Sequence, residues 1–200
     1  MISLVVGLGN VGPEYVGTRH NVGFEAVNRA ARLLKASRRI AHPLYESVMV
    51  QVADPIEGDR RVLLAWPGTY MNRSGIAVHN LLQQLQIGLE SALLVVDDFN
   101  LPLGALRFRP EGSDGGHQGL ASIIEELGTD NFPRLRLGIG APAENEDVAK
   151  YVLSRFEIGE LLPVETMLAK AAEAIIFALT HRLEEAMSQF NSGPALPDEA

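Results

Sequence analysis

His20, Asn72 and Asp97 each lie in a polar loop that follows an apolar stretch of the sequence. A histidine titrates near neutral pH and can take a proton from water, and a carboxylate on its other nitrogen fixes the tautomer and stabilises the charged ring. An asparagine offers amide donors to a developing oxyanion. Because these loops contain no lysine, water is the expected nucleophile. The three residue types suggest acid–base hydrolysis if the fold brings the loops together.

The first of these loops is rich in glycine and contains Gly7-x-Gly9-x-x-Gly12, which matches the dinucleotide-binding fingerprint. That fingerprint needs a helix that starts within the glycines and an acidic residue about 20 positions further on. Gly17 would lie inside such a helix, and residues 28–35 contain no acid. Nucleotide binding is therefore a weak alternative that a nicotinamide-binding test would check, and we expect no cofactor.

Composition favours one globular domain, because 46% of the 200 residues are apolar and 21% are charged. No run approaches the roughly 18 apolar residues of a membrane span. The chain has no cysteine, which excludes disulfides and thiolate metal sites, and His42, His79 and His181 show no ligand spacing. We expect a soluble cytoplasmic protein with no metal and no membrane partner.

The net charge of −8 is unevenly distributed. Residues 141–200 hold eleven acids and four bases, whereas residues 1–140 hold fourteen acids and thirteen bases. Arg107 and Arg109 fall on one face of a predicted strand, because side chains alternate along a strand. A basic face that binds phosphate is therefore compatible with the overall acidity.

Apolar runs alternate with stretches of helical periodicity along the chain. Strands are predicted over residues 2–6, 47–53, 61–66, 92–96, 105–109 and 135–139, with a turn over 54–59 between the second and third. A first helix is predicted over residues 21–35, and a second begins with Ser74 or Asn72 as its cap and runs to about Leu85. A third ends at about Leu127, and a fourth runs from Pro163 to about Phe190.

This alternation predicts an α/β fold with a twisted, mostly parallel or mixed β-sheet that helices cover on both faces. We expect a single domain over residues 1–190 and a flexible tail over 191–200. Strand ends in such a sheet can meet at a switch point, so His20, Asn72 and Asp97 are expected to face one another.

Several longer motifs give the chain a family resemblance. They are Val6-Gly7-Leu8-Gly9-Asn10 with Glu14-Tyr15 and Thr18-Arg19-His20-Asn21; Tyr70-Met71-Asn72-x-Ser74-Gly75; Asp97-Asp98 with Leu101-Pro102-x-Gly104; Gly115-Gly116-His117; and Arg134-Leu135-Arg136-x-Gly138-Ile139-Gly140. In order and spacing over residues 1 to about 190, the chain resembles the bacterial-type peptidyl-tRNA hydrolases.

The resemblance implies metal-free hydrolysis of the ester between a peptide, or an N-blocked amino acid, and tRNA. His20 matches the family's general base, Asp97 the acid that holds it, and Asn10 the residue that helps distinguish blocked from free aminoacyl groups. The positions that match substrate contacts are Tyr15, Tyr70, Asn72 and Gln118, and the basic positions suited to tRNA phosphate are Arg107, Arg109, Arg134 and Arg136. The implied partner is therefore tRNA, and we expect a monomer.

The chain departs from the family pattern at three positions. Val11 stands where proline is usual, Asn100 where aspartate is frequent, and Gln118 where asparagine is usual. Glutamine keeps the same donors and acceptor but carries them one methylene further out, so we expect altered geometry with retained activity. His117 is expected to begin a helix or shape the substrate site rather than act as a second base.

Two further expectations concern the C-terminal half and the activity. Residues 141–160 resemble a lid over the substrate cleft, and the amphipathic helix that follows is expected to pack on the sheet. The alternative from another class is an RNA-binding relative that does not cleave, whose sign would be tRNA binding without peptide release.

Overall fold

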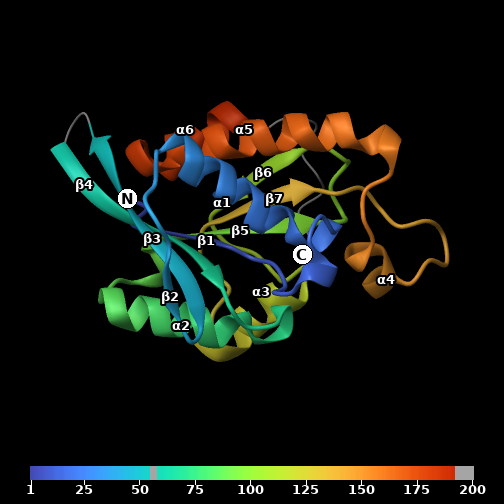
Figure 1. The fold of residues 1–200 in the computed structure, drawn as a ribbon, viewed down its shortest axis with the longest axis horizontal. Helices are drawn as coiled ribbons and strands as arrows, with labels where there is room; N and C mark the ends of the chain where they lie inside the picture. The colour runs from blue at the N-terminus through green and yellow to red at the C-terminus, as the bar shows by residue number, and fades with distance from the viewer. Residues whose placement is uncertain (55–57, 192–200) are drawn as a thin grey trace.

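A seven-stranded mixed sheet with the order β2-β3-β4-β1-β5-β7-β6 forms the centre of the molecule (Figure 1). The computed structural model describes residues 1–54 and 58–191. The strands are β1 (Leu4–Gly7), β2 (Ile40–His42), β3 (Tyr45–Asp54), β4 (Gly58–Pro67), β5 (Ala92–Asp98), β6 (Leu106–Arg109) and β7 (Arg134–Gly138). Strands β4, β1, β5 and β7 run parallel, whereas β2, β3 and β6 pair antiparallel with their neighbours. The predicted fold class is confirmed.

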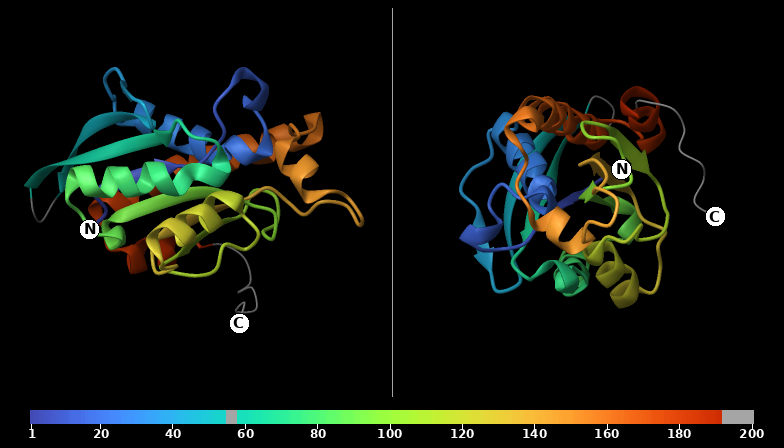
Figure 2. Two further views of the ribbon diagram at one scale, coloured as in Figure 1. Left: turned by 90° about the horizontal axis from the view of Figure 1, so that it is seen from below. Right: turned by 90° about the vertical axis from the view of Figure 1, so that its right-hand side faces the viewer.

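Helices cover both faces of this sheet (Figures 1 and 2). α1 (Val22–Leu33), α5 (Leu161–Thr180) and α6 (Leu183–Phe190) pack on one face, and α2 (Ser74–Leu85) and α3 (Gln118–Leu127) on the other. The short helix α4 (Val148–Leu153) lies beyond one end of the sheet. Within the described ranges, no helix combines the length and the apolar character needed to cross a bilayer.

Strands β1 and β5 are apolar up to the two aspartates that end β5, because both of their faces are covered. Every residue of β1 and β5 is buried, including the two aspartates that end β5. Burying a large aliphatic side chain contributes roughly 1.5–3 kcal/mol, so these runs dominate the core. The same burial explains why they could be assigned as strands from the sequence.

Other parts of the fold differ from the expectations. Neither Ser74 nor Asn72 caps α2, because Arg73 occupies the cap position without a side-chain hydrogen bond. The helix predicted from Pro163 to Phe190 is two helices, broken where His181 adopts an extended conformation. The sequence also gave no sign of β2 or α4. The predicted turn over 54–59 falls partly on residues 55–57, and the predicted tail over 191–200 falls mainly on residues 192–200. Both of these ranges lie outside the described residues.

The break between α5 and α6 lets α6 turn onto the edge strand β6. Phe190 then contacts Phe108 edge to face, with ring centroids 6.5 Å apart. Directly after α6, the Asn191 side chain accepts a hydrogen bond from the Phe108 amide (2.6 Å) and donates one to the Phe108 carbonyl (3.2 Å). Asn191 therefore anchors the C-terminal end of the described chain to β6.

Candidate active site

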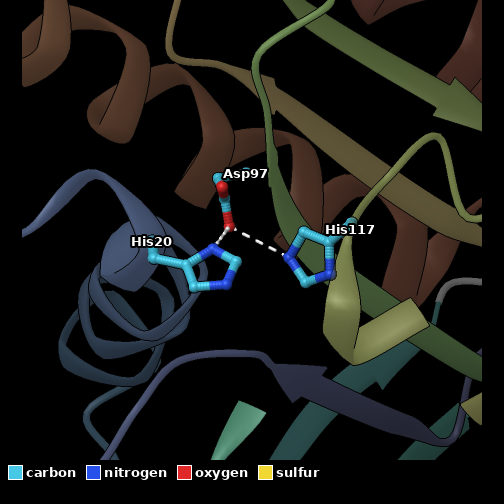
Figure 3. Close-up of side chains that lie close together, drawn as sticks. All are labelled: His20, Asp97 and His117. Carbon is cyan, nitrogen blue, oxygen red and sulfur yellow. Dashed lines mark hydrogen bonds and ion pairs between the residues drawn. The ribbon is translucent and has the colours of Figure 1, made fainter. Parts of the chain in front are cut away.

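His20, Asp97 and His117 come from three different elements and meet at the carboxyl end of the central strands (Figure 3). His20 lies in the 3-10 helix η2 (Arg19–Asn21) that leads into α1, Asp97 lies near the end of β5, and His117 precedes α3. Asp97 Oδ1 is 2.8 Å from His20 Nδ1 and 3.0 Å from His117 Nε2. All three side chains are buried.

Two glycines allow α1 to start close enough to the sheet to place His20 there. A Cβ at Gly23 would lie 2.4 Å from the Val95 carbonyl oxygen, and a Cβ at Gly7 would lie 2.5 Å from the Gly23 carbonyl oxygen. Because no side chain fits between them, the first turn of α1 rests directly on β1 and β5. Gly7 and Gly23 thus serve close packing, and α1 begins only at Val22, well after the Gly7-x-Gly9-x-x-Gly12 pattern.

The electrostatics of the pair favour an ionised Asp97 and a readily protonated His20. Burial lowers the pKa of His20, but the charge of Asp97 and its hydrogen bond outweigh burial and raise that pKa above its ordinary value. Burial raises the pKa of Asp97, but the two histidines outweigh it, and the pKa of Asp97 lies well below its ordinary value. Asp97 is therefore a carboxylate that accepts the His20 Nδ1 proton.

The second histidine is locked in one tautomer by the helix that it begins. His117 Nδ1 accepts hydrogen bonds from the amides of Gly119 (3.0 Å) and Leu120 (3.2 Å), so it carries no proton. The ring proton then lies on Nε2 and is donated to Asp97. His117 is thus the cap of α3, as predicted.

The same hydrogen bonds bear on metal binding. His20, Asp97 and His117 have ligand atoms within 4.8 Å of one another, which is close enough for one ion. A metal on His117 Nε2 would require that nitrogen to lose its proton, and the proton could only move to Nδ1, where two amides already donate. The arrangement therefore fits a chain of hydrogen bonds better than a metal site.

Asn10 is held by backbone and side-chain contacts on both sides. The backbone N–H of Asn10 donates to Asn21 Oδ1 (2.8 Å), and Asn21 Nδ2 donates to the backbone carbonyl of Asn10 (3.0 Å). Asn10 Oδ1 accepts from the Met71 amide (2.8 Å), so its Nδ2 group is left to donate elsewhere. An oriented amide donor thus stands on a residue that lines the same cavity as His20.

A cavity of about 580 Å³ joins these groups, a size typical of small-ligand sites. Seven of the candidate site residues named from the sequence line it, namely Asn10, His20, Tyr70, Asn72, Asp97, Gln118 and Arg136. Val148, Ala149, Val152 and Leu153 of α4 form a further wall of the cavity. They fall within residues 141–160, the segment that the resemblance suggested as a lid over the cleft, although the helix itself was not predicted. The expected meeting of the three loops is therefore what the fold produces.

Tyr15 is the predicted substrate contact that the described structure leaves outside this cavity lining. It ends the 3-10 helix Pro13–Tyr15, and its carbonyl accepts from the amide (3.1 Å) and the hydroxyl (2.8 Å) of Thr18. Here Tyr15 shapes the loop that leads to His20.

The four arginines suggested for phosphate binding lie on one face of β6 and β7, where Arg107 pairs with Arg136 and Arg109 with Arg134. Arg134 is 1% exposed and donates to the carbonyls of Phe132, Gly112, Ser113 and Asp130. Its pKa falls to about 10, chiefly because it is buried. The expectation of a phosphate contact at Arg134 is therefore corrected: this side chain holds loops together.

The other three arginines differ in access. Arg107 is 7% exposed, and burial and the neighbouring arginines lower its pKa. Arg136 lines the cavity and pairs with Asp98, whose other oxygen accepts from the Asn100 amide (2.8 Å). Arg109 is half-buried. Arg109 and Arg136 are thus the more accessible pair.

Of the three departures from the family pattern, Gln118 lines the cavity, whereas Val11 and Asn100 follow the lining residues Asn10 and Phe99 in the sequence. Asn100 Nδ2 donates to the Gly115 carbonyl (3.1 Å), which ties the loop after β5 to the loop before α3. Gln118 is exposed at the first position of α3 and lines the cavity beside His117. Gln118 therefore remains among the residues that line the site despite its longer side chain.

Known proteins resemble this chain over nearly its full length. A family model described as peptidyl-tRNA hydrolase matches residues 4–198. A peptidyl-tRNA hydrolase of Aquifex aeolicus is 45% identical over 190 residues, which cover 95% of this chain and 96% of the relative. One of Persephonella marina is 39% identical, covering 96% and 98%. The crystal structure of peptidyl-tRNA hydrolase from Acinetobacter baumannii superposes with a TM-score of 0.85 at 35% identity, covering 96% of this chain and 95% of that one.

Proposed function

The chain belongs to the peptidyl-tRNA hydrolase family, which is an enzyme family, and on that basis we propose that it hydrolyses the ester bond between tRNA and a peptide or N-blocked amino acid. The products are a free peptide and a tRNA that can re-enter translation. Because its substrate arises in translation, the proposed place of action is the cytoplasm, and the proposed active form is a monomer.

In the proposed mechanism, His20 acts as the general base. Asp97 accepts the Nδ1 proton, so Nε2 presents a lone pair that takes a proton from water while the water oxygen attacks the ester carbonyl carbon. The tetrahedral intermediate then collapses as the bond to the ribose oxygen breaks. The charged His20 returns its proton to that oxygen, which leaves a peptide acid and a tRNA hydroxyl.

The buried His20–Asp97 hydrogen bond carries this proposal, because it supplies both the tautomer and the stabilisation that a base needs. Asn10 and Asn72 offer amide groups at the cavity, and Asn10 Nδ2 is oriented by the bond from Met71. We assign Asn10 to the carbonyl groups of the blocked end, and Tyr70, Asn72 and Gln118 to the substrate near the tRNA 3′ end. Tyr15 would need a different loop conformation to join them.

The test is release of peptide from N-blocked aminoacyl-tRNA by the purified protein after treatment with a chelator. Wild-type protein should hydrolyse the blocked substrate and spare the unblocked one. His20→Ala should lower kcat by on the order of 10²–10⁴-fold, which is the usual contribution of a general base.

Binding of the same tRNA by His20→Ala, measured by filter retention, is the control for folding. An undiminished rate in the variant would remove His20 from the mechanism. A wild-type protein that binds tRNA but releases no peptide would instead be the non-cleaving RNA-binding relative, and Gln118 would be the first residue to revert to asparagine.

A further inference from the structure

We propose that Arg19 is a positioning residue that ties the α4 wall of the cavity to the loop that carries His20. Arg19 directly precedes His20 in η2, and α4 supplies Val148, Val152 and Leu153 to the cavity. The inference rests on the proposed function for its effect on catalysis, but the link itself is a matter of contacts that can be tested without activity.

Arg19 points away from the cavity and into the segment that follows α4. Its guanidinium forms a two-pronged pair with Glu160, at 3.1 Å to Oε1 and 2.6 Å to Oε2. Its Nε donates to Ser154 Oγ (3.2 Å), and Nη1 also donates to the Ile139 carbonyl (3.3 Å). Planar two-pronged pairs of this kind fix orientation as well as distance.

Two aromatic rings enclose the same guanidinium. Arg19 Cζ lies 4.5 Å from the ring centre of Tyr151 and 4.6 Å from that of Phe156. Tyr151, which belongs to α4, donates its hydroxyl to the Ile139 carbonyl (2.8 Å), the same oxygen that Arg19 reaches. One side chain therefore touches the end of β7, the helix α4 and the 3-10 helix Ile158–Glu160.

Backbone contacts tie the C-terminal end of α4 to the loop that carries His20. The Arg19 amide donates to the Ser154 carbonyl (2.9 Å), and Thr18 forms an isolated bridge with Arg155. Residues 144–150, which precede α4 and include its first three residues, are exposed. The position of the α4 wall thus depends mainly on its anchorage through Tyr151, Ser154 and Glu160, and Arg19 contacts all three.

The Arg19–Glu160 ion pair is largely shielded from water. The Arg19 side chain is 5% exposed and that of Glu160 is 25% exposed. The hydrogen bond from Arg19 outweighs desolvation and lowers the pKa of Glu160. Removing one partner leaves the other charge in a largely dry place, which disfavours the present arrangement. We expect α4 to move more freely when the pair is broken, so that the cavity wall no longer holds the substrate.

Glu160→Gln tests this inference, with Glu165→Gln as the matched control. Glu165 pairs with Arg29 between α5 and α1, so the control removes another Arg–Glu pair that lies outside the cavity lining. Glu160→Gln should raise KM for N-blocked aminoacyl-tRNA roughly three- to tenfold with kcat within about twofold of wild type, as expected when a binding wall is loosened. Glu165→Gln should change neither.

Hydrogen exchange of the free proteins provides the second readout. Amides of residues 148–160 should exchange faster in Glu160→Gln than in wild type or Glu165→Gln, while the central strands stay protected. Unchanged exchange in this segment would overturn the inference even if the enzyme is active. Faster exchange with unchanged KM would overturn it too, because the segment would then be shown not to support substrate. Exchange remains informative if the wild type proves inactive, so failure of the proposed function is recognised separately.

Discussion

At the scale of single residues, one oxygen of Asp97 serves two imidazole rings with different duties. His117 can only donate to it, because its other nitrogen accepts two backbone amides. His20 donates to the same oxygen through Nδ1 and keeps Nε2 for chemistry. The second donor holds the carboxylate in place and keeps it ionised, as the lowered pKa of Asp97 indicates. The arrangement therefore orients the base without adding a second one.

The raised pKa of His20 fixes the sign of the pH dependence. The base must be neutral to act, so kcat/KM should fall as the pH drops through the pKa of His20 in the free enzyme, which lies above the ordinary 6.5. Asp97→Asn removes the charge that raises this pKa and leaves the burial that lowers it. The acid limb should move to lower pH, and kcat should drop by on the order of 10²–10⁴-fold as the tautomer is lost.

A pH–rate profile of both proteins with an N-blocked aminoacyl-tRNA checks this pair of shifts. Titration of the His20 ring by NMR follows the same pKa without turnover. An acid limb that stays in place in Asp97→Asn would show that another group controls it.

Local motifs sufficed to find most of the polar residues that line the cavity, but not the apolar wall of α4 or the contacts that hold the polar residues in place. Asn21 stands in the quoted motif, yet its exchange of hydrogen bonds with Asn10 depends on a loop conformation that no spacing reveals. Arg19 contacts Glu160, which lies 141 positions further along the chain. Such contacts follow from the tertiary fold, so only the strongly patterned part of the site could be anticipated.

At the scale of elements, the start of α3 links helix stability to the site. His117 replaces the serine, aspartate or asparagine that usually caps a helix, and the same ring reaches Asp97 with its other nitrogen. Gly115 and Gly116 before it have φ values of 56° and 84°, which favour glycine and set the approach of the loop. A substitution of His117 should therefore have two separable effects, one on the stability of the protein through the helix cap and one on catalysis through the bond to Asp97.

Two variants of His117 separate these effects. His117→Ala loses the cap and should destabilise the protein by about 1 kcal/mol, in addition to losing the bond to Asp97. His117→Asn keeps a good cap but is too short to reach Asp97. This variant should recover most of the thermal stability that His117→Ala loses. We expect a lowered kcat in both variants, because neither keeps the bond to Asp97.

Melting curves and steady-state kinetics on the same preparations provide the measurement. If asparagine restored kcat along with Tm, the histidine would matter only as a helix cap, and its bond to Asp97 would be incidental.

Element prediction succeeded where burial imposes a clear pattern. The apolar strands β1 and β5 were assigned close to their bounds, and α1 and α3 follow their predicted helices closely. It failed for β2, whose Ile40 is 70% exposed, and for the break at His181, where the ring stacks on Phe177 with centroids 3.7 Å apart. Those features depend on tertiary neighbours rather than on local periodicity.

At the scale of the whole molecule, an acidic protein is proposed to bind a polyanion. The net charge is −8, but the excess of acid lies in the C-terminal third of the chain. Arg109 and Arg136 lie at the β6–β7 side of the sheet, and Arg136 also lines the cavity. Local positive charge on that side can therefore hold phosphate although the C-terminal third of the chain is acidic.

The salt dependence of tRNA binding should distinguish Arg109, which is proposed to contact phosphate, from Arg134, which holds loops together. Arg109→Gln should weaken tRNA binding and reduce the slope of log K against log salt by about one, because one phosphate contact releases about one counterion. Arg134→Gln should instead lower Tm, because it leaves buried carbonyls without donors.

Binding isotherms at several potassium chloride concentrations, together with melting curves, distinguish the two variants. Arg109 would be dismissed as a phosphate contact if its variant kept the wild-type slope.

The amide of Asn191 has a consequence for how copies of this protein behave toward one another. An open sheet ends in strands whose unpaired N–H and C=O groups invite a strand from another chain, which is a common start of aggregation. Asn191 occupies both outward groups of Phe108 as an adjacent strand would, and the opposite border, β2, is only three residues long. The margin at β6 thus offers little template for strand addition. Within the described ranges β2 pairs with only three of the ten residues of β3, so another copy of the folded protein would find the β3 edge more open to backbone pairing than the β6 edge.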